Sequence, residues 1–207
     1  MNDRVRLVPW AGCVGGWLIG LLVGALTLPS AFASTEIVIY GFEGSLEGWA
    51  IPDWAKASSD YVGEACRVSQ TVADEGQQAL ELLTAFPGER WTGVYVERQV
   101  EVTDWSPFSR LKLDLYLPAE APSGLGARVI LTVGEQWVWT EMNRTIPLVP
   151  GQWTTVTVNL KPGSLDWKFF PDERFRQDVR KLGIRIESNR DPAYRGSVFL
   201  DNVRLAE

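Results

Sequence analysis

The chain has 207 residues, a formal net charge of −6 with acidic and basic side chains interspersed, and no histidine. An acidic chain without a basic patch is a poor candidate for binding nucleic acid, because that affinity depends on neutralising phosphates. The lack of histidine excludes Ser-His-Asp and Cys-His catalysis as well as histidine-based zinc sites. Tryptophan is frequent, with ten residues.

The N-terminus has the features of an export signal. Two arginines in the first six residues precede an apolar stretch from Val14 to Leu28, and Ala31-Phe32-Ala33 supplies the small residues of a cleavage site. We therefore expect a signal peptide over residues 1–33, a secreted, periplasmic or cell-envelope location, and no membrane contact after cleavage. The alternative is a retained signal anchor, because the apolar stretch approaches the roughly 20 residues that span a bilayer. Residues 34–207 suit one domain.

Short runs of β-branched and aromatic residues alternate with polar residues and are separated by Gly, Pro, Asp and Asn. This pattern predicts strands near residues 36–42, 64–71, 78–85, 92–100, 110–117, 127–133, 136–142, 153–160, 182–188 and 197–205. Little of the remaining sequence has helical periodicity, apart from one helical turn that we expect between Asp172 and Arg180. The sequence therefore predicts an all-β fold, an antiparallel two-sheet β-sandwich of the jelly-roll type.

The alternation also predicts which side chains face the core. In the 110–117 run, four leucines at every second position point one way, and the 182–188 run has Ile184 and Ile186 at matching positions. The remaining positions of these runs and of 92–100 are expected on outward, exposed faces, as a sandwich of two sheets requires. They include Tyr95, Glu97, Lys112, Asp114, Tyr116, Arg185 and Glu187.

Tryptophans on an outward face suggest a sugar-binding surface. A sugar presents apolar C–H faces edged with hydroxyls, so its site needs flat aromatic rings beside polar side chains. If 136–142 is a strand, Trp137 and Trp139 share one face roughly 7 Å apart, and Trp91 extends that surface. Packing of both rings in the core is the alternative. The side chains expected to bond the hydroxyls are Tyr95, Asp114, Arg185 and Glu187.

Five segments carry a resemblance to a known group of proteins. They read YGFEGSLEGW, DEGQQALEL, DWSPFSRLKLDLYLP, LVPGQWTTVTVNL and VFLDNVRL, and they occur in this order along one all-β chain. In that order and spacing the chain resembles the jelly-roll carbohydrate-binding modules of the galactose-binding-domain-like group. The resemblance covers residues from about Ile37 to Leu205.

The resemblance implies a structural Ca²⁺ near both ends of the domain. In those modules an acidic residue after the first strand and an aspartate on the last strand are ligands, together with backbone carbonyls of an intervening turn. Glu43 and Asp201 match the two acidic positions, and Glu75 lies in the matching turn. Calcium accepts six to eight hard oxygen ligands, including carbonyls. Ordinary solvated carboxylates are the alternative interpretation.

Together these features predict a non-catalytic module that binds a polysaccharide or oligosaccharide. The resemblance also implies a glycoside hydrolase as a partner, because such modules commonly accompany a catalytic domain. One alternative is a structural or protein-interaction domain of the cell envelope. The other is a glycoside hydrolase or polysaccharide lyase that pairs outward carboxylates such as Glu97, Asp114 and Glu187.

Overall fold

The computed structural model describes residues 35–169, 172–190 and 192–207, so the expected signal peptide lies outside the described residues. Within the described residues, no helix is long and apolar enough to cross a bilayer. These residues form strands joined by loops, with two short helical segments, α1 (Asp53–Lys56) and the 3-10 helix η1 (Phe175–Gln177). The strands are β1 (Glu36–Tyr40), β2 (Gly63–Ser69), β3 (Ala79–Phe86), β4 (Trp91–Gln99), β5 (Arg110–Leu117), β6 (Leu125–Val133), β7 (Val138–Glu141), β8 (Ile146–Pro147), β9 (Gln152–Asn159), β10 (Val179–Asn189) and β11 (Tyr194–Ala206).

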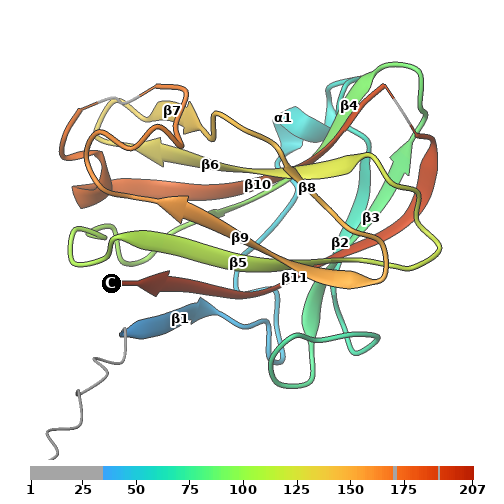
Figure 1. The fold of residues 1–207 in the computed structure, drawn as a ribbon, viewed down its shortest axis with the longest axis horizontal. Helices are drawn as coiled ribbons and strands as arrows, with labels where there is room; N and C mark the ends of the chain where they lie inside the picture. Colours follow the sequence, from blue (N-terminus) through green and yellow to red (C-terminus); the bar gives the residue numbers. More distant parts are fainter. Residues whose placement is uncertain (1–34, 170–171, 191) are drawn as a thin grey trace, which may run out of the picture. The chain divides into compact units, whose positions relative to one another are not determined.

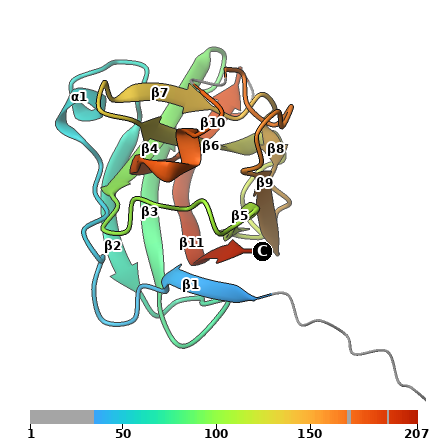
Figure 2. The same cartoon turned by 90° about the vertical axis from the view of Figure 1, so that its left-hand side faces the viewer.

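The strands form two sheets that lie face to face (Figures 1 and 2). One, the β11 sheet, has the order β2-β3-β11-β5-β9, with β1 pairing with β11. The other, the β10 sheet, has the order β4-β10-β6-β7, with β8 pairing with β6. Every pairing is antiparallel. The predicted two-sheet β-sandwich is confirmed.

The core lies between the sheets and consists of the inward apolar positions of both. The leucines of β5 and the isoleucines at 184 and 186 of β10 are fully buried, as the alternation predicts. Trp49 packs edge-on against Tyr40, with ring centroids 5.5 Å apart, and is 1% exposed. Burying such a large ring contributes several kilocalories per mole, since roughly 25 cal/mol is gained per Å² of apolar surface.

Two elements have no clear signal in the sequence. Helix α1 spans only four residues, which is too short for a helical period to appear. Strand β8 spans two residues and ends at a proline, which lacks the N–H that a longer ladder needs. The helical turn expected between Asp172 and Arg180 is present as η1.

The exposure of Tyr95 differs from the prediction. Its side chain faces outward from β4, as expected, but is only 1% exposed. The Trp54 ring of α1 lies 5.0 Å from its ring, and the Trp139 ring of β7 lies 5.5 Å from it. Room for Tyr95 comes from the neighbouring Gly183 of β10, where a Cβ would lie 2.1 Å from the tyrosine hydroxyl. A small apolar cluster thus forms on the outer face of the β10 sheet, containing Ile51, Ala55, Tyr95 and Ile130.

We predict that Gly183→Ala displaces the Tyr95 ring and disturbs the tryptophans above it. The added methyl overlaps ring atoms, and overpacking of this kind costs about 1–3 kcal/mol. Urea unfolding followed by tryptophan fluorescence measures both effects. Gly41→Ala is the matched control, because its Cβ would meet only Val38 at 3.8 Å. Equal losses of stability in the two variants would contradict the proposed packing.

Candidate functional site

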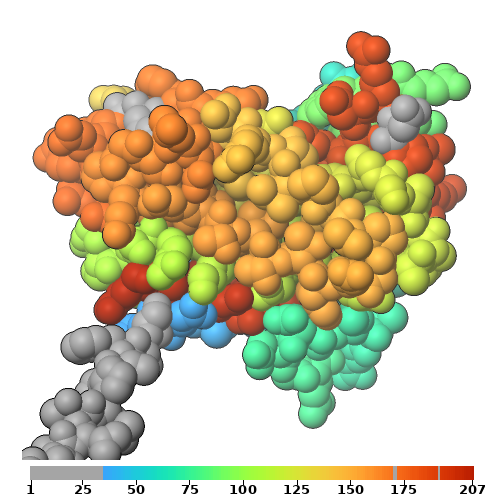
Figure 3. All heavy atoms as spheres, viewed as in Figure 1, coloured from blue at the N-terminus to red at the C-terminus, as the bar shows by residue number. Residues whose placement is uncertain are grey.

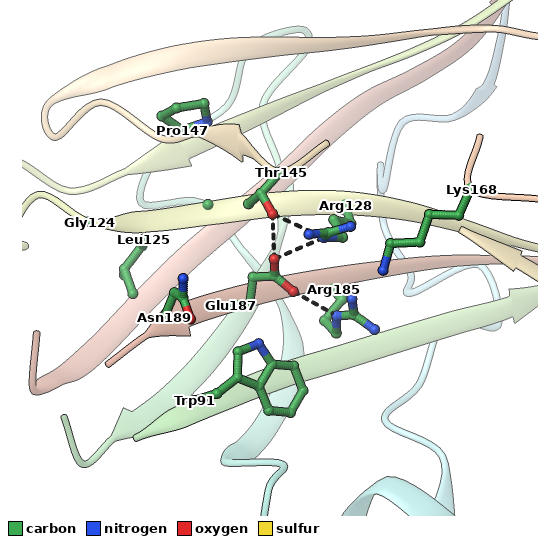
Figure 4. A pocket seen from close by; sticks show the side chains of 11 residues that line it. Trp91, Gly124, Leu125, Arg128, Thr145, Pro147, Lys168, Arg185, Glu187 and Asn189 are labelled. Atoms are coloured by element: carbon green, nitrogen blue, oxygen red, sulfur yellow. Dashed lines mark hydrogen bonds and ion pairs between the residues drawn. The ribbon is translucent and has the colours of Figure 1, made fainter. Parts of the chain in front are cut away.

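The outer face of the β10 sheet carries a buried network of charged side chains centred on Glu187 (Figure 4). Arg128 of β6 and Arg185 of β10 are cross-strand partners, which places their guanidinium groups side by side. Glu187 Oε1 accepts hydrogen bonds from Arg128 Nε, at 2.9 Å, and from the Thr145 hydroxyl. Its Oε2 accepts one from Arg185 Nε at 3.0 Å. Arg185 Nη2 also lies 2.9 Å from Glu141 Oε2 on β7.

Lys168 completes the network from the loop that follows β9. Its ammonium group pairs with Glu141, and its backbone N–H donates to the Glu141 carbonyl at 3.0 Å. Figure 4 shows the lysine side chain extending toward Arg128 and Arg185. Three cations therefore share two carboxylates, and this compensation allows Arg185 and Glu187 to be only 8% and 6% exposed.

The network holds its carboxylates in the ionised form. Burial alone would raise the pKa of Glu187, but hydrogen bonds from Thr145 and Arg128, together with the charge of Arg185, outweigh burial and lower it. The pKa of Glu141 is lowered in the same way, because its two cationic partners outweigh its burial. Both groups are therefore acceptors and neither is a proton donor near neutral pH.

An open cleft of about 520 Å³ lies over this network. The ring of Trp91 forms part of its wall, and the guanidinium carbon of Arg185 lies 5.5 Å from the centroid of that ring. The cleft is lined by Trp91, Gly124, Leu125, Gly126, Arg128, Thr145, Pro147, Lys168, Arg185, Glu187 and Asn189. Apolar ring surface and fixed polar groups thus face the same space, as in small-molecule sites generally.

Further aromatic rings continue from the cleft across the outer face. Tyr61 lies 6.0 Å from Trp91 and 5.1 Å from Trp54, and Trp54 lies 6.2 Å from Trp139, between ring centroids. Trp54 and Trp139 are 43% and 41% exposed. We call these four rings the aromatic strip. The buried Tyr95 lies beneath three of these rings, with its centroid 5.0 Å from Trp54, 5.5 Å from Trp139 and 6.3 Å from Tyr61.

The structure brings together five of the seven side chains that the sequence suggested for ligand binding. They lie on β4, β7 and β10, on one face of one sheet, and are Trp91, Tyr95, Trp139, Arg185 and Glu187. Tyr95 contributes as a buried support rather than as an exposed hydroxyl.

Trp137 does not share a strand face with Trp139, contrary to the expectation. Strand β7 begins only at Val138, and the Trp137 backbone N–H closes a turn onto the Gly134 carbonyl at 3.0 Å. Trp137 has a φ of 55°, which is outside the extended region. Its ring lies against Arg180 and Lys181, 5.6 and 5.9 Å from its centroid.

Asp114 lies on the other sheet and takes no part in the cleft. It belongs to β5, is 3% exposed, and pairs with Arg204 of β11 and the Thr155 hydroxyl of β9. The alternation correctly placed Asp114 on an outward face, but the expected exposure is wrong, because Arg204 and Thr155 contact its carboxylate. Alternation also does not specify which sheet a strand joins.

Several residues of the site were not selected from the sequence. Arg128 lies at an outward position of a predicted strand, so the same parity argument would have included it. Glu141 lies two residues after Trp139 in another predicted strand, so parity would have included it as well. The others come from loops or from α1, where no period fixes direction. The omitted residues are Trp54, Tyr61, Arg128, Glu141, Thr145 and Lys168.

The residues expected to bind calcium instead hold a loop through backbone N–H groups. Asp201 Oδ2 accepts from the N–H groups of Asp74 and Glu75, at 2.8 and 3.1 Å. Glu43 Oε1 accepts from those of Gln77 and Gln78, at 2.7 and 3.1 Å. The loop they hold connects β2 to β3 and protrudes at the edge of the β11 sheet (teal in Figure 3).

This donor set does not fit a cation. Calcium requires converging oxygens, whereas the loop directs amide hydrogens at Glu43 and Asp201 and occupies lone pairs that a metal would use. Among the described residues, no group of three or more His, Cys, Asp or Glu side chains is arranged to hold a metal.

Comparison with known proteins defines the fold. No protein-family model and no curated protein matches the chain. Among solved structures, the Caldicellulosiruptor saccharolyticus module CBM27-1, in complex with mannohexaose, aligns with a TM-score of 0.56 and 19% identity, over 84% of this chain and 97% of that one. A non-crystalline cellulose specific module, CBM28, gives 0.60 and 19%, over 83% and 94%. The fold is that of the β-sandwich carbohydrate-binding modules.

A third solved structure supports the same assignment of the fold. The family 11 module from Clostridium thermocellum, in complex with a β-1,3-1,4-mixed-linked tetrasaccharide, aligns with a TM-score of 0.51 and 17% identity. The alignment covers 84% of this chain and 96% of that module. At these identities the similarity establishes the arrangement of strands, and the binding residues must be argued from this chain itself.

We predict that Asp201→Ala destabilises the domain, because it leaves three N–H groups, of Asp74, Glu75 and Asn202, without their acceptor. A buried donor without a partner costs about 1–3 kcal/mol. Thermal unfolding measures the loss, with Asp53→Ala as control, since the Asp53 side chain is 99% exposed. Neither calcium nor a chelator should move the midpoint of the parent protein. A rise of several degrees with calcium would show that a metal site exists here.

We predict that Glu187 makes stability depend on acid pH. Its folded pKa lies below the ordinary value of 4.5, so its stabilising contribution is complete above that pH and is lost as the pH falls toward the folded pKa. Urea unfolding between about pH 6 and about pH 3 should show a smaller decline for Glu187→Gln than for the parent. Glu64→Gln removes a more exposed pair with Arg195 and should keep the parental slope. Identical slopes for all three proteins would contradict the prediction.

Proposed function

We propose that the protein is a non-catalytic carbohydrate-binding module that holds a polysaccharide or oligosaccharide on the outer face of the β10 sheet. The observation that supports this most is the aromatic strip beside a cleft lined by fixed charged groups. Exposed rings bind the apolar faces of sugars, and the cleft supplies partners for hydroxyls. The solved neighbours in complex with mannohexaose and with a mixed-linked tetrasaccharide support a saccharide ligand.

The electrostatics of the cleft favour binding over hydrolysis. A glycosidase needs one carboxyl group with a raised pKa to protonate the leaving oxygen. Glu141 and Glu187 both have lowered pKa values and are tied to cations. We propose accordingly that the module acts without catalysis, after export with its signal peptide removed. A separate glycoside hydrolase that acts on the same polymer would be its partner.

Affinity electrophoresis on glucan, mannan and xylan tests this proposal. Trp91→Ala and Trp139→Ala should each weaken retention about tenfold, because losing one stacked ring removes about 1.4 kcal/mol. Trp153→Ala is the matched control, since that half-buried ring lies against Tyr116 on the β11 sheet. Retention that is equal in all variants, or absent both for these glycans and for an acidic polysaccharide, would overturn the proposal, as would turnover of a bound polymer.

A further inference from the structure

The cleft is cationic in a chain that is acidic overall. Its described lining includes three cations, Arg128, Lys168 and Arg185, and one carboxylate, Glu187. Glu141 adds a second carboxylate behind them, paired with Arg185 and Lys168. The network therefore has one more positive than negative charge, although the whole chain has a formal net charge of −6.

The lining of the cleft also offers a ligand more hydrogen-bond donors than acceptors. Guanidinium and ammonium groups only donate, and an arginine has five N–H donors. Within the described residues, the polar contacts of Arg128 use Nε and Nη1, and those of Arg185 use Nε and Nη2, so each retains N–H groups for a ligand. Both oxygens of Glu187, by contrast, already accept hydrogen bonds inside the network. The charged groups of this cleft therefore offer a ligand mainly hydrogen-bond donors.

Such a lining suits a ligand group that only accepts hydrogen bonds. A sugar hydroxyl both donates and accepts, whereas an ionised carboxylate only accepts and matches the planar guanidinium fork. The ring of Trp91 at the same wall offers a stacking surface for the sugar that carries this group. The excess positive charge adds an attraction that a neutral sugar does not feel.

We propose that the cleft selects an acidic sugar, a uronic acid residue whose carboxylate lies against Arg128, Arg185 and Lys168. This inference rests on the proposed function and specifies its substrate class. The guanidinium groups are held in place by Glu187 and Glu141 before the ligand arrives, so little side-chain entropy is lost on binding.

The test uses one polymer in two forms, a uronic acid-containing polysaccharide and the same material after reduction of its carboxyl groups to alcohols. Titration calorimetry of the full domain should give about tenfold tighter binding to the acidic form. That preference should shrink at high salt, because ions screen the attraction. Equal affinity for both forms overturns the uronic acid inference and leaves the proposed function intact. Absence of binding to both forms and to neutral glucan, mannan and xylan overturns both.

A pair of lysine variants tests the assignment to this cleft. Lys168→Gln should lower the ratio of acidic to reduced-polymer affinity about threefold or more, because one of three cations is removed. Lys161→Gln, in a hollow beside Arg110 of the β11 sheet, should leave that ratio unchanged. An unchanged ratio in Lys168→Gln overturns the assignment to this cleft. A sulfated polymer of neutral sugars that binds as tightly as the uronic acid form overturns the choice of a uronic acid as ligand.

Discussion

Glu187 is almost completely buried on a face of the sheet that points away from the core, and its charge requires compensation there. A buried carboxylate is tolerated only when opposite charges and hydrogen bonds replace the water it has lost. Arg128, Arg185 and Thr145 supply them, and each is thereby held in one orientation. Part of the geometry of the cleft follows from this requirement, because the three groups that bond Glu187 also line the cleft.

The same face uses apolar packing to hold its aromatic rings. Gly183 lacks a side chain, so the Tyr95 ring approaches β10 closely there, and Trp54 and Trp139 pack against that ring. These contacts fix the exposed rings before any ligand binds, which lowers the entropic cost of binding. The packing of the aromatic strip therefore depends on the missing side chain of Gly183, which leaves room for Tyr95.

At the β11 sheet, two carboxylates serve the architecture by holding a loop. Glu43 and Asp201 are in the positions that the resemblance to carbohydrate-binding modules implied for calcium, yet they accept backbone N–H groups of the β2–β3 loop. A carboxylate and a metal ion are alternative ways to tie such a loop to the sheet. Here the protein's own amides bond Glu43 Oε1 and both oxygens of Asp201.

The sequence by itself determined most of the strands, the two-sheet class of fold and the outward direction of Arg185, Glu187 and Asp114. These properties follow from a period of two residues, which is a local signal. Tertiary structure alone decided that Asp114 belongs to the opposite sheet, since strand order depends on pairing between distant segments. It also decided that Tyr95 is covered by α1, that Trp137 lies in a turn, and that loops deliver Lys168 and Thr145 to the cleft, because none of these contacts has a periodic signature.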